Sequence, residues 1–171
     1  MTVIELSVEE YLWFVDDCLE AMTSIVEELG DDLANTRPEL PGANSPYAIL
    51  THCLGVLEFW GGAMVAGRPI QRDRDAELVA AGPVAEVRES VARSRERFVA
   101  DLARLESRAR PTHPLPAEDA GLPFDRSQAG VLVHVFHELA QHLGQVEITR
   151  DLLRAGGHPA QAEPPPRLDR T

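Results

Sequence analysis

The stretch HVFHELAQHLGQ, residues 134–145, holds three histidines and one glutamate within nine residues. Imidazole nitrogens and carboxylate oxygens are ligands that zinc and other divalent metals take in proteins. The apolar residues around them recur at helical spacing, so the direction of each side chain follows from its position along a helix. Spacing therefore decides which of these four side chains are able to share one metal ion.

The string HELAQH within this stretch is similar to the HExxH motif of zinc proteases, but it contains one residue too many. In that motif, two histidines four residues apart bind zinc from one face of a helix. His137 and His142 are five residues apart, and side chains at that spacing diverge by about 140°. These two histidines therefore do not share an ion.

Glu138 and His142 are four residues apart, which favours them as a pair of ligands. Side chains at this spacing differ by about 40° around the helix and by one turn along it, so they converge. Both lie beside the apolar face of the segment, whereas His137 points away from it. That face is formed by six residues: Val131, Leu132, Val135, Leu139, Leu143 and Val146.

A catalytic zinc site takes three protein ligands, so another ligand must come from elsewhere in the chain. His52 is the candidate, because apolar residues surround it at helical spacing: Ile49, Val56, Phe59 and Ala63. His52, Glu138 and His142 together would form a His-Glu-His site with one open position. The alternative is that His52 is a hydrogen-bonded core residue. The pattern alone leaves both interpretations open, although an inward glutamate without a partner is costly.

Two neighbouring residues, Gln145 and His134, are predicted to contact a cofactor bound at this site. Gln145 lies about 60° from His142 on the helical wheel, close enough to touch a group bound at the metal, and a solvent-facing glutamine is the alternative. His134 precedes Glu138 by one turn and could orient its carboxylate, and a partly exposed surface histidine is the alternative. The only cysteines, Cys18 and Cys53, are predicted to be buried packing thiols rather than nucleophiles.

These residues must be positioned by helices. Start and stop signals in the sequence mark four of these helices. Ser7 and Glu10 form a capping box, and Ser45-Pro46 places proline at the first position of a helix. No alternating strand pattern competes with them. The four predicted helices span residues 7–30, 45–62, 83–108 and 126–154. Four helices in one domain predict an all-α bundle.

The 171 residues fit one domain, predicted to span residues 1–155, followed by a Pro-rich flexible tail over residues 156–171. The formal net charge of −12 argues against nucleic acid and anionic membranes as partners. The N-terminus lacks a basic region followed by an apolar one, and no apolar run approaches the length that spans a bilayer. A cytoplasmic location is expected.

Three stretches of the sequence carry a resemblance to one family. Residues 138–151, ELAQHLGQVEITRD, resemble the last-helix signature of DinB-like proteins from actinobacteria, and residues 45–56, SPYAILTHCLGV, resemble their second-helix histidine motif. Residues 72–77, RDRDAE, resemble the linker that follows. The most similar subgroup is the mycothiol S-transferases.

This resemblance implies a DinB-like four-helix bundle with a long crossover between its second and third helices, for which residues 67–82 provide the length. It implies a divalent metal, usually zinc, held by His52, Glu138 and His142, the residues that helical spacing also selects. The chain departs from the family at position 137, where we expect an acidic residue and find His137. Because that position points outward, we expect no effect on the metal.

The activity that the resemblance implies is metal-dependent conjugation of the thiol mycothiol to electrophiles, as in detoxification. It also implies a possible homodimer. One alternative is a mycothiol-dependent isomerase, against which the short Pro-rich tail speaks, because such enzymes usually carry a further C-terminal domain. The other alternative is a non-catalytic DinB-like metal-binding protein.

Overall fold

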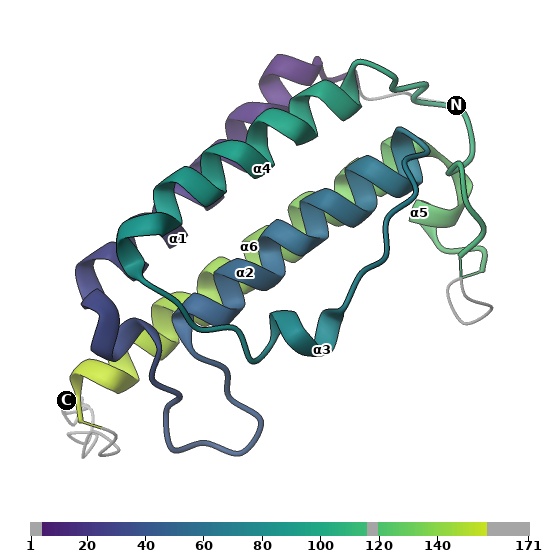
Figure 1. The fold of residues 1–171 in the computed structure, drawn as a ribbon. Helices are drawn as coiled ribbons and strands as arrows, with labels where there is room; N and C mark the ends of the chain where they lie inside the picture. The colour runs from purple at the N-terminus through teal and green to yellow at the C-terminus, as the bar shows by residue number, and fades with distance from the viewer. Residues whose placement is uncertain (1–4, 116–119, 157–171) are drawn as a thin grey trace, which may run out of the picture.

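A computed structural model describes residues 5–115 and 120–156, and all regular structure within these ranges is helical (Figure 1). This confirms the all-α prediction for the described residues. The elements are α1 (Val8–Ala34), α2 (Pro46–Val56), the π-helix η1 (Leu57–Val65), α3 (Arg74–Glu77), the 3₁₀-helix η2 (Val84–Glu86), α4 (Val87–Leu102), α5 (Pro123–Arg126) and α6 (Gln128–Arg154).

The long helices lie side by side around one apolar core, with α1 beside α4 and α2 beside α6 (Figure 1). Helix α1 also packs against α6, and η1 packs against α4. Apolar side chains from all of these helices enter the core, including Val15, Ile49, Phe98 and Val135. On the outside, Arg88 of α4 binds two glutamates of α1, which joins the charged surfaces of these helices.

The helix starts follow the capping signals of the sequence. The Ser7 capping box is present, and the Ser45 hydroxyl accepts the backbone N–H of Ala48. Ser127 caps α6 by accepting the N–H of Gly130, one residue beyond the predicted start. The predicted start at Pro83 leads first into the turn of η2, and α4 begins at Val87.

One predicted helix end coincides with an interruption of the helix, and another is wrong. The helical backbone of α1 is interrupted at Gly30, the predicted end, whose φ of 67° only glycine adopts readily, and a second helical segment then runs to Ala34. The predicted helix over residues 83–108 ends at Leu102, because the following backbone pairs with the start of α6 instead. There the N–H of Gln128 donates to the Ala109 carbonyl, and the N–H of Ala129 donates to the Ser107 carbonyl.

The second helix extends beyond its predicted end at Gly61-Gly62 and changes type along its length. The π-helix η1 continues α2 without a break, and the N–H of Ala66 donates to the Gly61 carbonyl five residues back. A Cβ at Gly61 would lie 2.4 Å from the Phe98 ring, so glycine lets α4 approach η1 closely.

The apolar continuity of α2 and η1 corrects one expectation from the sequence. The 20 residues Pro46–Val65 are long and apolar enough to cross a membrane, and an 18-residue window within them has a mean hydropathy of 1.4. However, 72% of that window is buried inside the protein. Core helices of soluble proteins pass the same test, so the segment is weak support for a membrane span.

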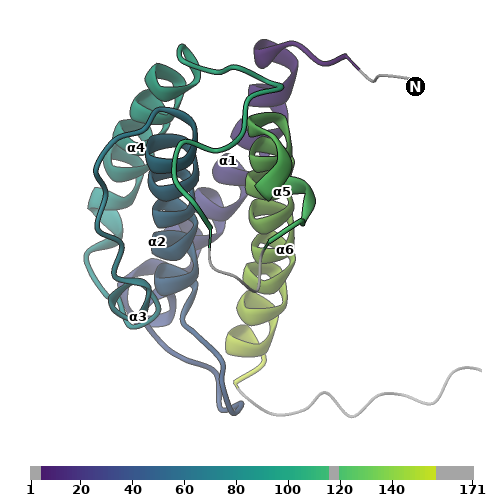
Figure 2. The ribbon, with the colours of Figure 1, turned by 90° about the vertical axis from the view of Figure 1, so that its right-hand side faces the viewer.

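The connection between η1 and α4, residues 66–83, runs along α2 and contains α3, which the sequence did not predict (Figures 1 and 2). Arg68 ties its start to α4 by donating to both oxygens of Asp101. Asn35 ties its end to α1 through hydrogen bonds with the backbone of Gly82. Of the predicted tail, only Gly156 belongs to the described residues.

Candidate metal centre

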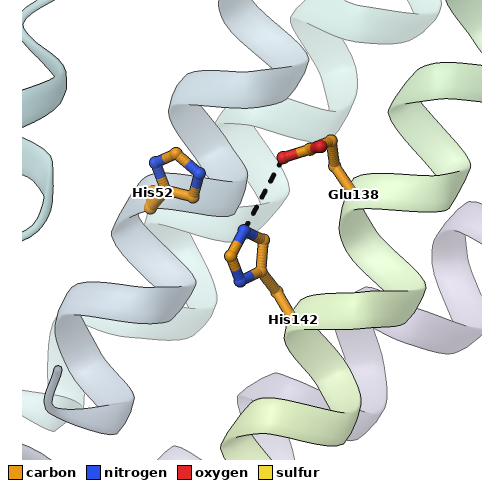
Figure 3. Close-up of side chains that lie close together, drawn as sticks. All are labelled: His52, Glu138 and His142. Atoms are coloured by element: carbon orange, nitrogen blue, oxygen red, sulfur yellow. Dashed lines mark ion pairs between the residues drawn. The ribbon is translucent and has the colours of Figure 1, made fainter. Parts of the chain in front are cut away.

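Helices α2 and α6 bring His52, Glu138 and His142 together, although the first is far from the other two in the sequence (Figure 3). One ligand atom from each residue lies within 4.8 Å of the others. Glu138 and His142 occupy successive turns of α6, whose neighbouring face is buried. His52 lies on the inner face of α2 and is 1% exposed. These are the three residues that helical spacing selects.

Glu138 and His142 form the more accessible part of this cluster. The Nε2 atom of His142 lies 3.7 Å from Oε2 of Glu138, and their side chains are 21% and 24% exposed. The interaction with Glu138 raises the pKa of His142 above its usual value, and the same interaction lowers the pKa of Glu138. His142 therefore binds a proton more readily than an isolated histidine does, because the ionised carboxylate of Glu138 lies beside it.

His52 is the buried part of the cluster, and its two ring nitrogens have different surroundings. Nδ1 lies 2.9 Å from Oε2 of Glu77, on α3. Nε2 is buried and has no hydrogen-bond partner among the residues that the structure describes. Burial lowers the pKa of His52, so the ring is neutral near neutral pH.

Glu77 and Arg72, which pair with each other, have no role that helical spacing predicts. Nε and Nη2 of Arg72 each donate to one oxygen of Glu77 at 2.8 Å. Both residues belong to the stretch 72–77, whose resemblance to the family linker was the only signal in the sequence. Their position beside His52 depends on how the connection folds back over α2, which helical spacing does not report.

Gln145 contacts the other histidine of the cluster. Nδ1 of His142 lies 2.9 Å from Oε1 of Gln145, so this amide accepts a hydrogen bond from the nitrogen that faces away from Glu138. Gln145 also lines a groove of about 640 Å³ between α6 and the loop at residues 38–43. The structure thus places Gln145 at the cluster, as a partner of a candidate ligand.

His134 lies beside Glu138 but at longer range than a hydrogen bond. Its Nε2 is 3.9 Å from Oε1 of Glu138. The ring stacks on Phe124 with centroids 4.3 Å apart and meets Trp60 edge to face at 4.5 Å. His134 therefore joins an aromatic cluster to the carboxylate. His137 is exposed and points away from the two ligand candidates on α6.

The protein's own thiols are poorly placed for chemistry. Cys18 and Cys53 are both buried and free. Burial raises the pKa of the Cys53 thiol and that of Cys18. Since the thiolate is the nucleophilic form, neither cysteine is suited to attack a substrate.

The donor set fits a divalent metal of the zinc type. Two imidazoles and one carboxylate form a common catalytic zinc set. Two ligand atoms at about 2.1 Å from one tetrahedral ion lie about 3.4 Å apart, close to the 3.7 Å between His142 and Glu138. A buried imidazole nitrogen without a partner costs free energy, which a bound metal would offset.

Residues 15–146, which include all three candidate ligands, match the DinB superfamily. The chain belongs to this superfamily. The match covers α2 and η1, the whole connection with α3, and α4, and it ends within α6 beyond His142. A search of curated proteins finds no match to the chain.

Proposed function

We propose that this protein is a metal-dependent thiol transferase that conjugates mycothiol to electrophilic substrates. The proposal places the chain in the mycothiol S-transferase subgroup of the DinB superfamily, with the η1–α4 connection as the crossover of a four-helix bundle. Its domain would span residues 1–155, and residues 156–171 would form a tail. The observation that carries the proposal is the cluster of His52, Glu138 and His142 with an orphaned, buried Nε2.

In this proposal His52, Glu138 and His142 would hold the metal, most simply Zn²⁺, because two imidazoles and a carboxylate suit that ion. A bound zinc would keep the cysteinyl sulfur of mycothiol deprotonated near neutral pH, since a coordinated thiol loses its proton. The overall reaction forms a carbon–sulfur bond from the thiol and the electrophile and releases the proton and any leaving group. The chain needs no nucleophile of its own, in keeping with its buried cysteines.

The surrounding residues would support this chemistry in distinct ways. The partial exposure of Glu138 and His142 gives small molecules access to the cluster. Gln145 fixes the ring of His142 through Nδ1 and borders the groove beside α6, where it would contact the bound thiol. His134 would limit the movement of the Glu138 carboxylate.

The partners in this proposal are a small-molecule thiol and an electrophile, in the cytoplasm. Nucleic acid and membranes are not expected, because a net charge of −12 disfavours anionic surfaces. A homodimer is a further expectation from the family resemblance. Light scattering tests it, and a mass near 18.8 kDa would count against it.

Two other functions compete with this proposal. A mycothiol-dependent isomerase would use the same ligands and the same thiol, but would rearrange its substrate without consuming the thiol. A non-catalytic metal-binding protein would hold the ion without turnover. Thiol consumption therefore separates the transferase from both alternatives.

The test follows depletion of mycothiol in the presence of a thiol-reactive probe, with glutathione as the control thiol. The transferase consumes mycothiol faster than glutathione, and chelator treatment removes the difference. His137→Ala serves as the matched control for His142→Ala, because His137 is an exposed histidine on the same helix. Equal rates with both thiols, or no effect of the chelator, would contradict the proposal.

A further inference from the structure

We propose that Glu77 is a positioning residue for the metal centre: its carboxylate holds His52 in the tautomer that leaves Nε2 free to bind a metal, and Arg72 and Gly55 keep that carboxylate in place. The inference rests on the proposed metal site and assigns a role to the connection between η1 and α4. Through this contact, α3 becomes part of the metal centre although it contributes no ligand.

The contacts of His52 decide its tautomer. An ionised carboxylate only accepts hydrogen bonds, so the 2.9 Å contact with Glu77 requires a proton on Nδ1. Arg72 Nη2 also approaches Nδ1, at 3.2 Å, but it donates to Glu77 at the shorter distance of 2.8 Å. The proton therefore belongs on Nδ1, and Nε2 carries the free lone pair. Metal-binding histidines commonly have such a carboxylate partner.

Arg72 fixes the direction of the Glu77 carboxylate. The guanidinium donates to both carboxylate oxygens, a two-point contact that sets the plane of the carboxylate. The side chains of Arg72 and Glu77 are only 17% and 12% exposed, so water screens the pair weakly. The guanidinium carbon also lies 5.8 Å from the centre of the Phe59 ring, which restrains Arg72 from the side of η1.

The absence of a side chain at Gly55 leaves room for the Glu77 carboxylate beside α2. It lies three residues after His52, on the same side of the helix. A Cβ on Gly55 would be 2.1 Å from Oε1 and 2.4 Å from Cδ of Glu77, so any larger residue must displace the carboxylate. The displacement would break the contacts with Arg72 and His52, because both hold the same end of the side chain.

The first experiment reads the tautomer of His52 without any metal. Nitrogen-15 NMR of the metal-free protein reports which ring nitrogen carries the proton. We expect the proton on Nδ1 in the unaltered protein, and a shift of population toward protonated Nε2 in Glu77→Ala. If the unaltered protein already carries the proton on Nε2, or if Glu77→Ala leaves it on Nδ1, the inference is wrong whether or not a metal binds.

The second experiment measures zinc affinity by competition with a chelator. We expect Glu77→Ala to weaken binding by roughly 10- to 100-fold, the usual effect of losing such a partner. Glu77→Gln keeps an acceptor for Nδ1 and should lose less zinc affinity than Glu77→Ala. Asp75→Asn is the matched control, because it removes one negative charge from the same short helix at an exposed position. Equal losses in Asp75→Asn and Glu77→Ala would reduce the effect to net charge and overturn the inference.

Substitution of Gly55 is an independent test, because it leaves every charged group of the site present. We expect Gly55→Ala to weaken zinc binding and alter the His52 tautomer as Glu77→Ala does. Gly144→Ala, on α6 beside His142, is the control, because a Cβ there meets nothing within 4 Å. Circular dichroism and melting temperature confirm that each variant folds. Wild-type affinity and tautomer in Gly55→Ala would contradict the inference, while a protein that binds no zinc would contradict only the proposed function.

Discussion

The rings of His52 and His142 meet edge to face, with centroids 4.8 Å apart, across the interface of α2 and α6 (Figure 3). Nδ1 of each ring lies 2.9 Å from a side-chain oxygen, that of Glu77 for His52 and that of Gln145 for His142. The remaining nitrogens face the same space as the Glu138 carboxylate. The two histidines are thus oriented in the same way by partners from two different parts of the chain.

Loss of either histidine should abolish metal retention. We expect about one divalent metal per purified chain, and none in His52→Ala or His142→Ala, because two remaining ligands bind an ion weakly. His137→Ala should retain the metal, since His137 is exposed and points away from the cluster. Elemental analysis of the purified proteins measures the content. Loss of metal in His137→Ala together with retention in His142→Ala would reverse the assignment.

The positions of the candidate ligands could be predicted from the sequence because these residues lie on regular helices. On α6 the buried face includes Val131, Val135 and Leu139, as predicted, and this fixes the direction of Glu138 and His142. The same reasoning succeeds for His52, because α2 is regular as far as Val56.

The rest of the site could not be predicted, because it depends on tertiary contacts. Glu77 reaches His52 only because the connection folds back along α2, and Arg68 fixes the start of that path by binding Asp101. The π-helix η1 also has no simple signal in its sequence. At Gly61 it lies close to the Phe98 ring of α4, a tertiary contact that a helical wheel does not contain.

Metal affinity should rise with pH across the neutral range. The raised pKa of His142 means that the metal-free protein binds a proton at a ligand nitrogen, so metal and proton compete. The lowered pKa of His52 and of Glu138 removes those groups from the competition near neutrality. The expected change is about tenfold in affinity per pH unit, which corresponds to one proton, until pH exceeds the raised pKa of His142. Isothermal titration in buffers of different ionisation enthalpy counts the released proton, and pH-independent affinity from about pH 6 to about pH 8 would refute the competition.

Asp101 should be important for stability because it anchors the η1–α4 connection. It is 5% exposed and accepts two hydrogen bonds from Arg68 at 2.8 Å. Asp101→Ala leaves Arg68 with Glu58 alone, and we expect a loss of about 3 kcal/mol in the free energy of unfolding. Glu89→Ala, which removes an exposed partner of Arg93 on the same helix, should cost less than about 1 kcal/mol. Denaturant unfolding of both variants measures the difference, and equal losses would contradict the role of Asp101.

Gly130 should tolerate no side chain, because α5 packs directly on it. A Cβ there would lie 2.1 Å from the backbone oxygen of Pro123, and a backbone atom moves less readily than the end of a side chain. We expect Gly130→Ala to cost about 1 to 3 kcal/mol and to displace Phe124 from the ring of His134. Gly144→Ala should instead be neutral or stabilising by up to about 1 kcal/mol, since alanine favours a helix. Thermal unfolding and the NMR signals of His134 report the two effects, and an unchanged His134 environment in Gly130→Ala would show that α5 adapts.

Glu138→Gln should reduce activity mainly through loss of metal. The amide is a weaker ligand than the carboxylate, and it removes the anion that lies 3.7 Å from Nε2 of His142. The shape of the side chain is preserved, so the helix and its buried face should be unaffected. We therefore expect low metal content and a low rate of mycothiol consumption after purification, and partial recovery of the rate with excess zinc. Measuring the rate and the metal content over one zinc series separates binding from chemistry. A variant that holds a full equivalent of zinc and still fails to consume mycothiol would show that the carboxylate takes part in the reaction itself, beyond holding the ion.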